Sequence, residues 1–250
     1  MHDVYWYKKI WSLDIKDNTW VEDTENQVDF VVKTLGLIGS ERILDLACGY
    51  GRHSLSLARR GFSVVGVDIT KEYIDDAVKI AKENKLNAEF IYSDIRDLKF
   101  DNKFDVVLNL ADGAIGYLET DDENLKIFDV VAKALKSGGK HFMDVCNAEH
   151  AELYFPKRHW QIGEKEIALA DFEWIPETRR MLYGGGGIKL GEILQKPDII
   201  PTNPTRLYSK SELGVILEKR GMEIVSSFSD YYGTPDSNKK LQIMVYSKRV

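Results

Sequence analysis

The 250-residue sequence predicts an α/β fold built on a doubly wound, mostly parallel β-sheet. Short apolar runs alternate with amphipathic runs over residues 24–146, a pattern typical of buried parallel strands joined by helices. In the first such unit, the apolar run Ile43-Leu44-Asp45-Leu46 leads into the turn Gly49-Tyr50-Gly51, where a helical run begins. A strand-to-helix turn of this kind holds a nucleotide-like ligand against the helix N-terminus.

Capping residues and hydrophobic periodicity predict the other elements in chain order. Capping boxes at Thr24 and Thr120, and a start at Thr70, indicate helices whose apolar residues recur at helical spacing. A further capping box, Ser209-Lys210-Ser211-Glu212, begins a last helix that we expect to end at Gly221. Strands are predicted over residues 43–46, 64–67, 88–92, 104–110, 141–146, 223–229 and 241–247.

Residues 148–205 have a different pattern, which we interpret as an inserted β-rich lid. They show little helical periodicity and give short β-like runs at residues 160–163, 167–174 and 180–183. The four glycines at residues 184–187 lack the G-K-[ST] of a phosphate loop, so we expect a hairpin tip there. The chain is then expected to return to the core through Pro197, Pro201 and Pro204. The expected organisation is cap helices and a binding core over residues 1–147, the lid over 148–205, and the rest of the core over 206–250.

Two ligands compete for the first strand-to-helix turn. A dinucleotide site requires G-x-G-x-x-G, and residues 49–54 match it except that Ser54 stands at the third glycine position. That template does not include Asp45, four residues before Gly49. A carboxylate there would repel a pyrophosphate and would attract the cationic amino group of a methionine moiety. These residues favour S-adenosylmethionine over a nicotinamide dinucleotide.

The stretch from Asp45 to Gly51 resembles the D/E-x-x-x-G-x-G motif of the class I S-adenosylmethionine-dependent methyltransferases, although Ala47 stands where many members have glycine. Three further motifs of that family are matched in order, by Asp68, by Ser93-Asp94-Ile95 and by residues 134–139. The resemblance implies a Rossmann-like seven-stranded sheet with an antiparallel last strand. It also implies that Asp68 binds the ribose and Asp94 the adenine edge. The implied cofactor-binding residues are Asp45, Ala47, Cys48, Gly49, Arg52, Asp68, Ile69, Asp94, Ile95, Asn109 and Leu110.

The same resemblance implies in-line methyl transfer from S-adenosylmethionine. Such a reaction depends on aligning two reactants more than on acid-base groups. No catalytic residue is therefore predicted, and no set of His, Cys and carboxylate residues has the spacing of a metal site. The net charge of −6 argues against a nucleic-acid acceptor, which demands a basic face, so we expect a small-molecule acceptor.

The composition also gives an expectation of the compartment. Cys48 and Cys146 are too few for a disulfide framework, and no window is apolar enough to span a membrane. We expect a cytoplasmic protein without membrane contacts. The sequence does not predict the oligomeric state.

Several alternatives remain open from the residues alone. The near match to G-x-G-x-x-G allows a nicotinamide-dependent oxidoreductase, and the fold allows a non-catalytic protein that only binds S-adenosylmethionine. The aromatic residues Tyr5, Trp6 and Tyr7 either fold over the cofactor or make ordinary packing contacts. In the predicted lid, His159 and Trp160 either touch the acceptor or lie on the surface.

Overall fold

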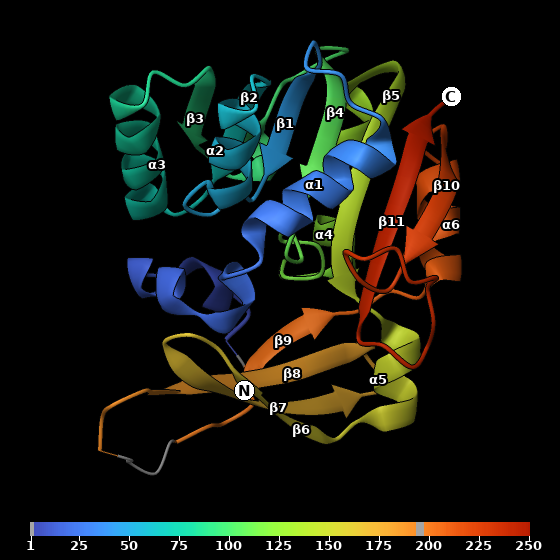
Figure 1. Ribbon diagram of the computed structural model, residues 1–250. Coiled ribbons are helices and arrows are strands. Elements are labelled where there is room, and N and C mark those ends of the chain that lie inside the picture. Colours follow the sequence, from blue (N-terminus) through green and yellow to red (C-terminus); the bar gives the residue numbers. More distant parts are fainter. Residues whose placement is uncertain (1–2, 194–197) are drawn as a thin grey trace.

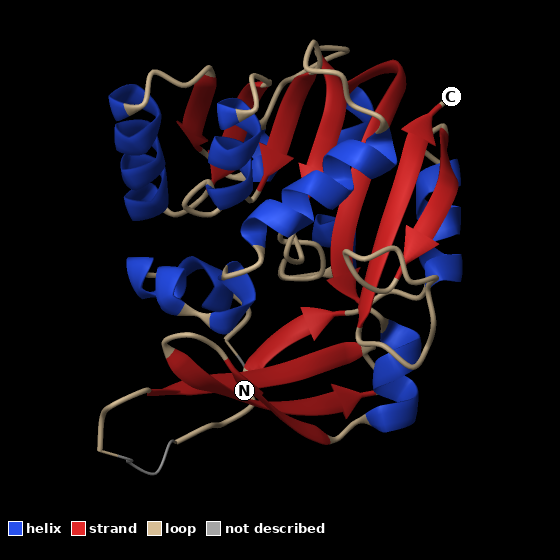
Figure 2. Ribbon diagram, in the orientation of Figure 1, coloured by secondary structure: helices blue, strands red, loops and turns tan. Residues whose placement is uncertain are grey.

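The computed structural model describes residues 3–193 and 198–250 and contains two β-sheets (Figure 1). The larger sheet consists of β1 (Arg42–Leu46), β2 (Ser63–Asp68), β3 (Ala88–Tyr92), β4 (Phe104–Asn109), β5 (Leu135–Cys146), β10 (Met222–Phe228) and β11 (Gln242–Arg249). The smaller sheet consists of β6 (Lys157–Ile162), β7 (Glu166–Ile175), β8 (Arg180–Lys189) and β9 (Asn203–Arg206). Figure 2 shows the smaller sheet below the larger one, with short N-terminal helices between them on one side.

The larger sheet confirms the predicted Rossmann-like architecture. Its strands lie in the order β10-β11-β5-β4-β1-β2-β3, so the chain runs outward from β1 in both directions. The neighbours from β3 to β5 are parallel, whereas β11 pairs antiparallel with both β5 and β10. The antiparallel last strand is therefore confirmed as well.

Helices cover both faces of this sheet because the apolar residues of its strands alternate between the faces. In β1, Ile43 packs in a core with Val28 and Leu57, whereas Leu44 packs on the other face in a core with Phe128 and Leu213. The helices are α1 (Thr24–Leu35), α2 (Arg52–Arg59), α3 (Lys71–Glu83), α4 (Asp121–Ala134), α5 (Ala148–Tyr154) and α6 (Lys210–Glu218).

The capping predictions have different outcomes at the three helix starts. The complete capping box at Ser209 is present, and the Thr120 side chain accepts a hydrogen bond from the backbone of Glu123. The capping box at Thr24 was a wrong prediction, because Asp23 precedes α1 and makes no side-chain cap. The side chains of Thr24 and Gln27 instead accept hydrogen bonds from Arg52 on α2.

Strand β5 begins earlier than the sequence predicts. It starts at Leu135 rather than at His141, and the predicted turn at residues 134–139 forms its irregular beginning. The pairing with β4 shifts register between Phe104 and Val106, and Gly138 has a left-handed φ of 73°. The glycines of this motif therefore allow an irregularity within the strand.

The insert, residues 148–205, differs from its prediction at the glycine run. Gly184 to Gly187 lie within β8, opposite Ala168 to Asp171 of β7, and the hairpin turns at residues 176–179 instead. A Cβ at Gly184 would lie 2.6 Å from the carbonyl of Ile200, and one at Gly185 would collide with the Tyr183 hydroxyl. The glycines thus serve close approach rather than a turn. The predicted role of Pro197 falls outside the described residues.

The N-terminal segment, residues 3–22, forms three short 3₁₀ helices, η1 (Trp6–Lys8), η2 (Leu13–Asp17) and η3 (Thr19–Val21). It contacts the insert, because Trp6 Nε1 donates to the Pro204 carbonyl at 3.1 Å and Glu22 accepts from the Glu164 backbone at 2.7 Å. It also contacts the core, where Tyr73 Oη donates to the Ser12 carbonyl at 2.9 Å. None of the described helices is long and apolar enough to cross a membrane.

Candidate active site

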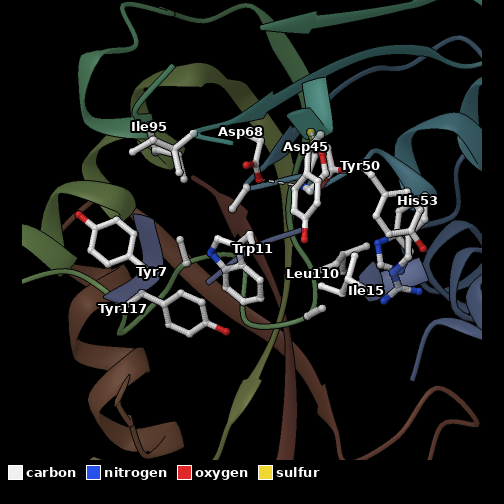
Figure 3. A pocket seen from close by; sticks show the side chains of 18 of the residues that line it. Tyr7, Trp11, Ile15, Asp45, Tyr50, His53, Asp68, Ile95, Leu110 and Tyr117 are labelled. Carbon is white, nitrogen blue, oxygen red and sulfur yellow. Dashed lines mark hydrogen bonds between the residues drawn. The ribbon is translucent and has the colours of Figure 1, made fainter. Parts of the chain in front are cut away.

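A cavity lies at the carboxyl ends of β1, β2, β3 and β4, where doubly wound sheets bind their ligands (Figure 3). In Figure 3, Asp45, Asp68 and Ile95 follow one another across the cavity, and Trp11 lies below them in the view. Apart from Asn109, every residue that the sequence analysis assigns to the cofactor lines this cavity. The core supplies one wall, and the N-terminal segment supplies the other through Tyr7, Trp11, Ile15 and Trp20.

Asp45 places a carboxylate at the bottom of the cavity. It belongs to β1, is 1% exposed, and its Oδ2 accepts a 2.6 Å hydrogen bond from Ser54 Oγ on α2. Burial raises the pKa of Asp45 to about 7, and the charge of Asp68 raises it further, against the lowering effects of Ser54 and Arg52. A cationic ligand would stabilise the charged form of this carboxylate.

The turn after β1 is fixed by Asp68, at the end of β2. One oxygen of its carboxylate accepts from the Gly49 backbone at 2.8 Å and the other from the Thr70 backbone at 2.8 Å. Gly51 has a φ of 80°, and a Cβ there would lie 2.8 Å from the Phe90 ring, so glycine is required. Burial raises the pKa of Asp68, whereas these backbone hydrogen bonds lower it.

Ala47 adopts a conformation that usually belongs to glycine. Its φ is 53°, in the left-handed region that favours glycine. Its neighbour Cys48 is buried, and burial raises the pKa of its thiol well above the ordinary value. The thiol therefore contributes packing rather than a nucleophile.

Asp94 is placed at the cavity, but its carboxylate already has a partner. Arg96 donates to it through Nε at 2.9 Å, through Nη2 at 2.6 Å and through its backbone N–H at 3.0 Å. The hydrogen bonds from Arg96 lower the pKa of Asp94, although burial opposes this effect. Arg96 also binds Glu119 and Glu123, and Glu119 accepts from Tyr7 Oη at 2.9 Å. Adenine-edge recognition by Asp94 stays a prediction.

Asn109 does not line the cavity, so the structure does not support its predicted direct contact with the cofactor. Its amide donates to the Gly113 carbonyl at 2.9 Å, and its Oδ1 lies 3.2 Å from His141 Nε2. The side chain is fully buried and shapes the loop after β4. Leu110, the next residue, does line the cavity.

Arg52 lines the cavity and also contacts the N-terminal part of the chain. Its Nη1 donates to Thr24 at 2.7 Å and to Gln27 at 2.6 Å, and its guanidinium lies 5.1 Å from the centre of the Trp20 ring. His53 completes this group with a 2.8 Å hydrogen bond between its Nε2 and Gln27 Oε1. Both residues line the cavity, so the start of α2 presents these side chains to it.

Sequence reasoning missed part of the lining. The aromatic richness of the N-terminal segment was the available signal for Trp11 and Trp20, but nothing in the spacing pointed to Ala111, Ala114 and Tyr117. The insert also differs from expectation, because none of its described residues lines the cavity. His159 and Trp160 lie exposed on β6.

The residues present fit S-adenosylmethionine. Asp45 would offer a buried carboxylate to the methionine ammonium, and Asp68 would offer its carboxylate oxygens to the ribose hydroxyls. Ile69 and Ile95 give apolar surface beside Asp68 and Asp94, as an adenine ring requires.

Comparisons with known proteins match the chain to methyltransferases. A family model described as a methyltransferase domain matches residues 39–212. A putative methyltransferase of Geobacillus sp. is 27% identical over 164 residues, which is 66% of this chain and 64% of that protein. The tRNA (uracil(54)-C(5))-methyltransferase of Pyrococcus horikoshii is 38% identical over 95 residues, which is 38% of this chain and 23% of that protein. The chain thus spans less than two thirds of the length of either relative.

Two solved structures share the fold. An S-adenosylmethionine-dependent methyltransferase from Clostridium acetobutylicum has a TM-score of 0.75 at 18% identity, covering 94% of this chain and 96% of that one. The 1,6-didemethyltoxoflavin-N1-methyltransferase of Burkholderia thailandensis has a TM-score of 0.61 at 16% identity, covering 98% of this chain and 87% of that one.

The chain belongs to the class I S-adenosylmethionine-dependent methyltransferases, because the family model covers most of it. Its cofactor is S-adenosylmethionine. This family membership replaces the nicotinamide-dependent oxidoreductase that the residues alone had left open.

Proposed function

We propose that this methyltransferase transfers the methyl group to a small-molecule acceptor. The observation that carries the proposal is the lining of the cavity opposite the cofactor residues. Aromatic and apolar surface is supplied there by Trp11, Ile15, Trp20 and Tyr117, of which the first three belong to the N-terminal segment. Such a lining suits a compact, partly apolar acceptor, whereas a phosphate backbone is bound by a basic groove.

The chain contributes binding and alignment to the reaction. S-adenosylmethionine supplies an electrophilic methyl group on a sulfonium. Asp45 is proposed to hold the methionine end and Asp68 the ribose, and Leu110 and the loop after β4 line the same cavity. Holding two reactants in attack geometry supplies roughly 7 to 11 kcal/mol of the barrier, and a covered cavity excludes water from the reacting atoms.

The insert is proposed to act as a support for the N-terminal segment. Lys165 forms an ion pair with Asp17, and the backbone of Glu164 donates to Glu22. A Cβ at Gly163 would lie 2.5 Å from a methyl group of Thr19, so the hairpin approaches the segment closely. We keep the proposed division of the chain into residues 1–147, 148–205 and 206–250. In this division the insert contacts the N-terminal segment, and that segment lines the cavity.

Transfer of a trideuteromethyl group tests the acceptor class. Labelled S-adenosylmethionine and the protein are incubated separately with a deproteinised low-molecular-weight extract and with total tRNA, and both are examined by mass spectrometry. The proposal expects a labelled compound in the extract and none in the tRNA. Label in tRNA alone would overturn it in favour of a nucleic-acid acceptor, such as that named for the Pyrococcus relative.

A further inference from the structure

Tyr117 and Asp112 form a hydrogen-bonded pair at the cavity. The Tyr117 ring lines the cavity, and its hydroxyl donates to Asp112 Oδ2 at 3.0 Å. The ring is held in place by Trp6, whose ring centre lies 4.8 Å away, and by Trp11, which stacks at 6.3 Å with an interplanar angle of 17°. Figure 3 shows the Tyr117 hydroxyl turned away from Tyr7. Since the phenol hydrogen is donated to Asp112, the lone pairs of the phenol oxygen are free to accept a hydrogen bond.

The backbone that presents Asp112 is strained in a way that points to function. Residues 111–114 all have left-handed φ values, between 51° and 66°, and three of them are not glycine. Gly113 is required, because a Cβ there would lie 2.5 Å from the Asn109 side chain. The Asp112 backbone N–H donates to the Asp144 carbonyl at 2.8 Å, which anchors the turn to β5. Left-handed L-residues cost conformational energy, and such strain concentrates at functional sites.

A second buried carboxylate lies beside this pair. Asp144 accepts from Tyr231 Oη at 2.8 Å and from Gln242 Nε2 at 2.9 Å. Burial and the charge of Asp112 raise the pKa of Asp144 to about 7, while Arg52 lowers it. Burial also raises the pKa of Asp112, although the hydrogen bond from Tyr117 lowers it.

We propose that Tyr117 accepts the proton of the methyl acceptor, that Asp112 positions Tyr117 and receives its phenol proton, and that the acceptor therefore carries an O–H or N–H at its reacting atom. This inference rests on the proposed function. As the acceptor oxygen or nitrogen forms its bond to the methyl carbon, the sulfur–carbon bond breaks and its electron pair stays on sulfur. The acceptor proton moves to Tyr117 Oη, the phenol proton moves to the Asp112 carboxylate, and one proton is finally released to solvent.

Small aromatic probes test the pair without knowledge of the natural acceptor. The protein is saturated with S-adenosylhomocysteine, and binding of phenol, aniline, anisole and N,N-dimethylaniline is measured by NMR titration. We expect phenol and aniline, which can donate to Tyr117, to bind about three- to ten-fold more tightly than their methylated counterparts. Tyr117→Phe should remove this preference and leave anisole binding unchanged, whereas Tyr92→Phe on the exposed face of β3 should keep the preference.

A separate measurement tests whether Asp112 acts on Tyr117. Burial raises the pKa of Tyr117, and the Asp112 carboxylate raises it further, so Asp112→Asn should shift the ionisation of Tyr117 to lower pH in ¹³C NMR of tyrosine Cζ. Phenol and anisole binding equally well, or a Tyr117 ionisation unmoved by Asp112→Asn, would overturn the inference. Failure to bind S-adenosylhomocysteine at all would instead overturn the proposed function, so the two outcomes are distinct.

Discussion

Ser54 Oγ donates a 2.6 Å hydrogen bond to Asp45 Oδ2, and both side chains are buried. Ser54 stands where a dinucleotide-binding turn has its third glycine, which there permits close packing of helix and strand. In this chain the same position holds a donor that orients a carboxylate. We interpret this departure from the dinucleotide motif as part of the proposed site for the methionine ammonium.

The affinity for S-adenosylhomocysteine should rise with pH up to about 7 and then level off. The ligand ammonium requires the charged form of Asp45, whereas burial holds the pKa of this carboxyl at about 7 in the free protein. Below that pH, binding must release the Asp45 proton, which weakens affinity about ten-fold per pH unit. Calorimetry between pH 5.5 and 8 in two buffers of different ionisation enthalpy measures affinity and proton release together. A flat profile without proton release would contradict the role of Asp45.

Ser54→Ala should move the midpoint of this profile to higher pH. The lost hydrogen bond favours the charged carboxylate, so its removal raises the pKa of Asp45. Ser56→Ala is the matched control, since Ser56 is equally buried on α2 but donates to Glu25 instead. Equal midpoints in the two variants would show that Ser54 does not act on Asp45.

Asp68→Ala should weaken binding of S-adenosylhomocysteine roughly ten-fold to a hundred-fold, as expected for a charge-assisted hydrogen bond of about 1.5 to 3 kcal/mol. Asp94→Ala should lower the affinity for S-adenosylhomocysteine less, because the Asp94 carboxylate is already paired with Arg96. Asp68 also holds the Gly49 backbone, so thermal unfolding must accompany the calorimetry. Wild-type affinity in a folded Asp68→Ala variant would remove Asp68 from the ribose site.

Gly113→Ala should destabilise the protein by about 2 to 3 kcal/mol, because a Cβ there meets the side chain and backbone of Asn109. Gly138→Ala is the control, since Gly138 also has a left-handed φ but has open space around its Cβ position. The Gly138→Ala variant should lose only about 1 kcal/mol of its free energy of unfolding. Urea unfolding of both variants gives the comparison, and equal losses would show that the Asn109 contact is unimportant.

Cofactor binding should protect the N-terminal segment from trypsin. Lys8 and Lys16 lie in the segment whose aromatic residues line the cavity, so a bound ligand should hold the segment in place. We expect S-adenosylhomocysteine to slow cleavage there by about five-fold or more. Cleavage at Lys239 and Lys240, in the exposed loop before β11, serves as the internal control. Equal slowing at both places would indicate a general stabilisation rather than closure of the segment.

The sequence predicted the sheet and most residues along one wall of the cavity, because both depend on local patterns. Apolar runs such as Ile43 to Leu46 and acidic strand ends such as Asp68 can be read directly from the chain. The glycine run at residues 184–187 could not be placed, because its role depends on Ile200 approaching Gly184 from a distant part of the chain. Long-range contacts of this kind leave no periodic signal.

The wall of the cavity that includes Tyr117 could not be predicted either, because it also depends on contacts between distant parts of the chain. Tyr117 reaches the site through an irregular turn whose left-handed residues include Ala111 and Asp112, and propensity does not predict such a turn. Gln27 was interpreted as part of a local cap, but it binds Arg52 and His53 instead. Hydrogen bonds to another helix thus take the place of the local capping hydrogen bond that the sequence predicted.

Calorimetry with S-adenosylhomocysteine and NAD, compared on the same protein at pH 7.5, tests the central claim most directly. The account predicts that S-adenosylhomocysteine binds at least about a hundred-fold more tightly than NAD, because Asp45 attracts an ammonium and repels a pyrophosphate. Asp45→Asn should narrow that difference. Tighter binding of NAD than of S-adenosylhomocysteine would contradict the assignment of this cavity to S-adenosylmethionine.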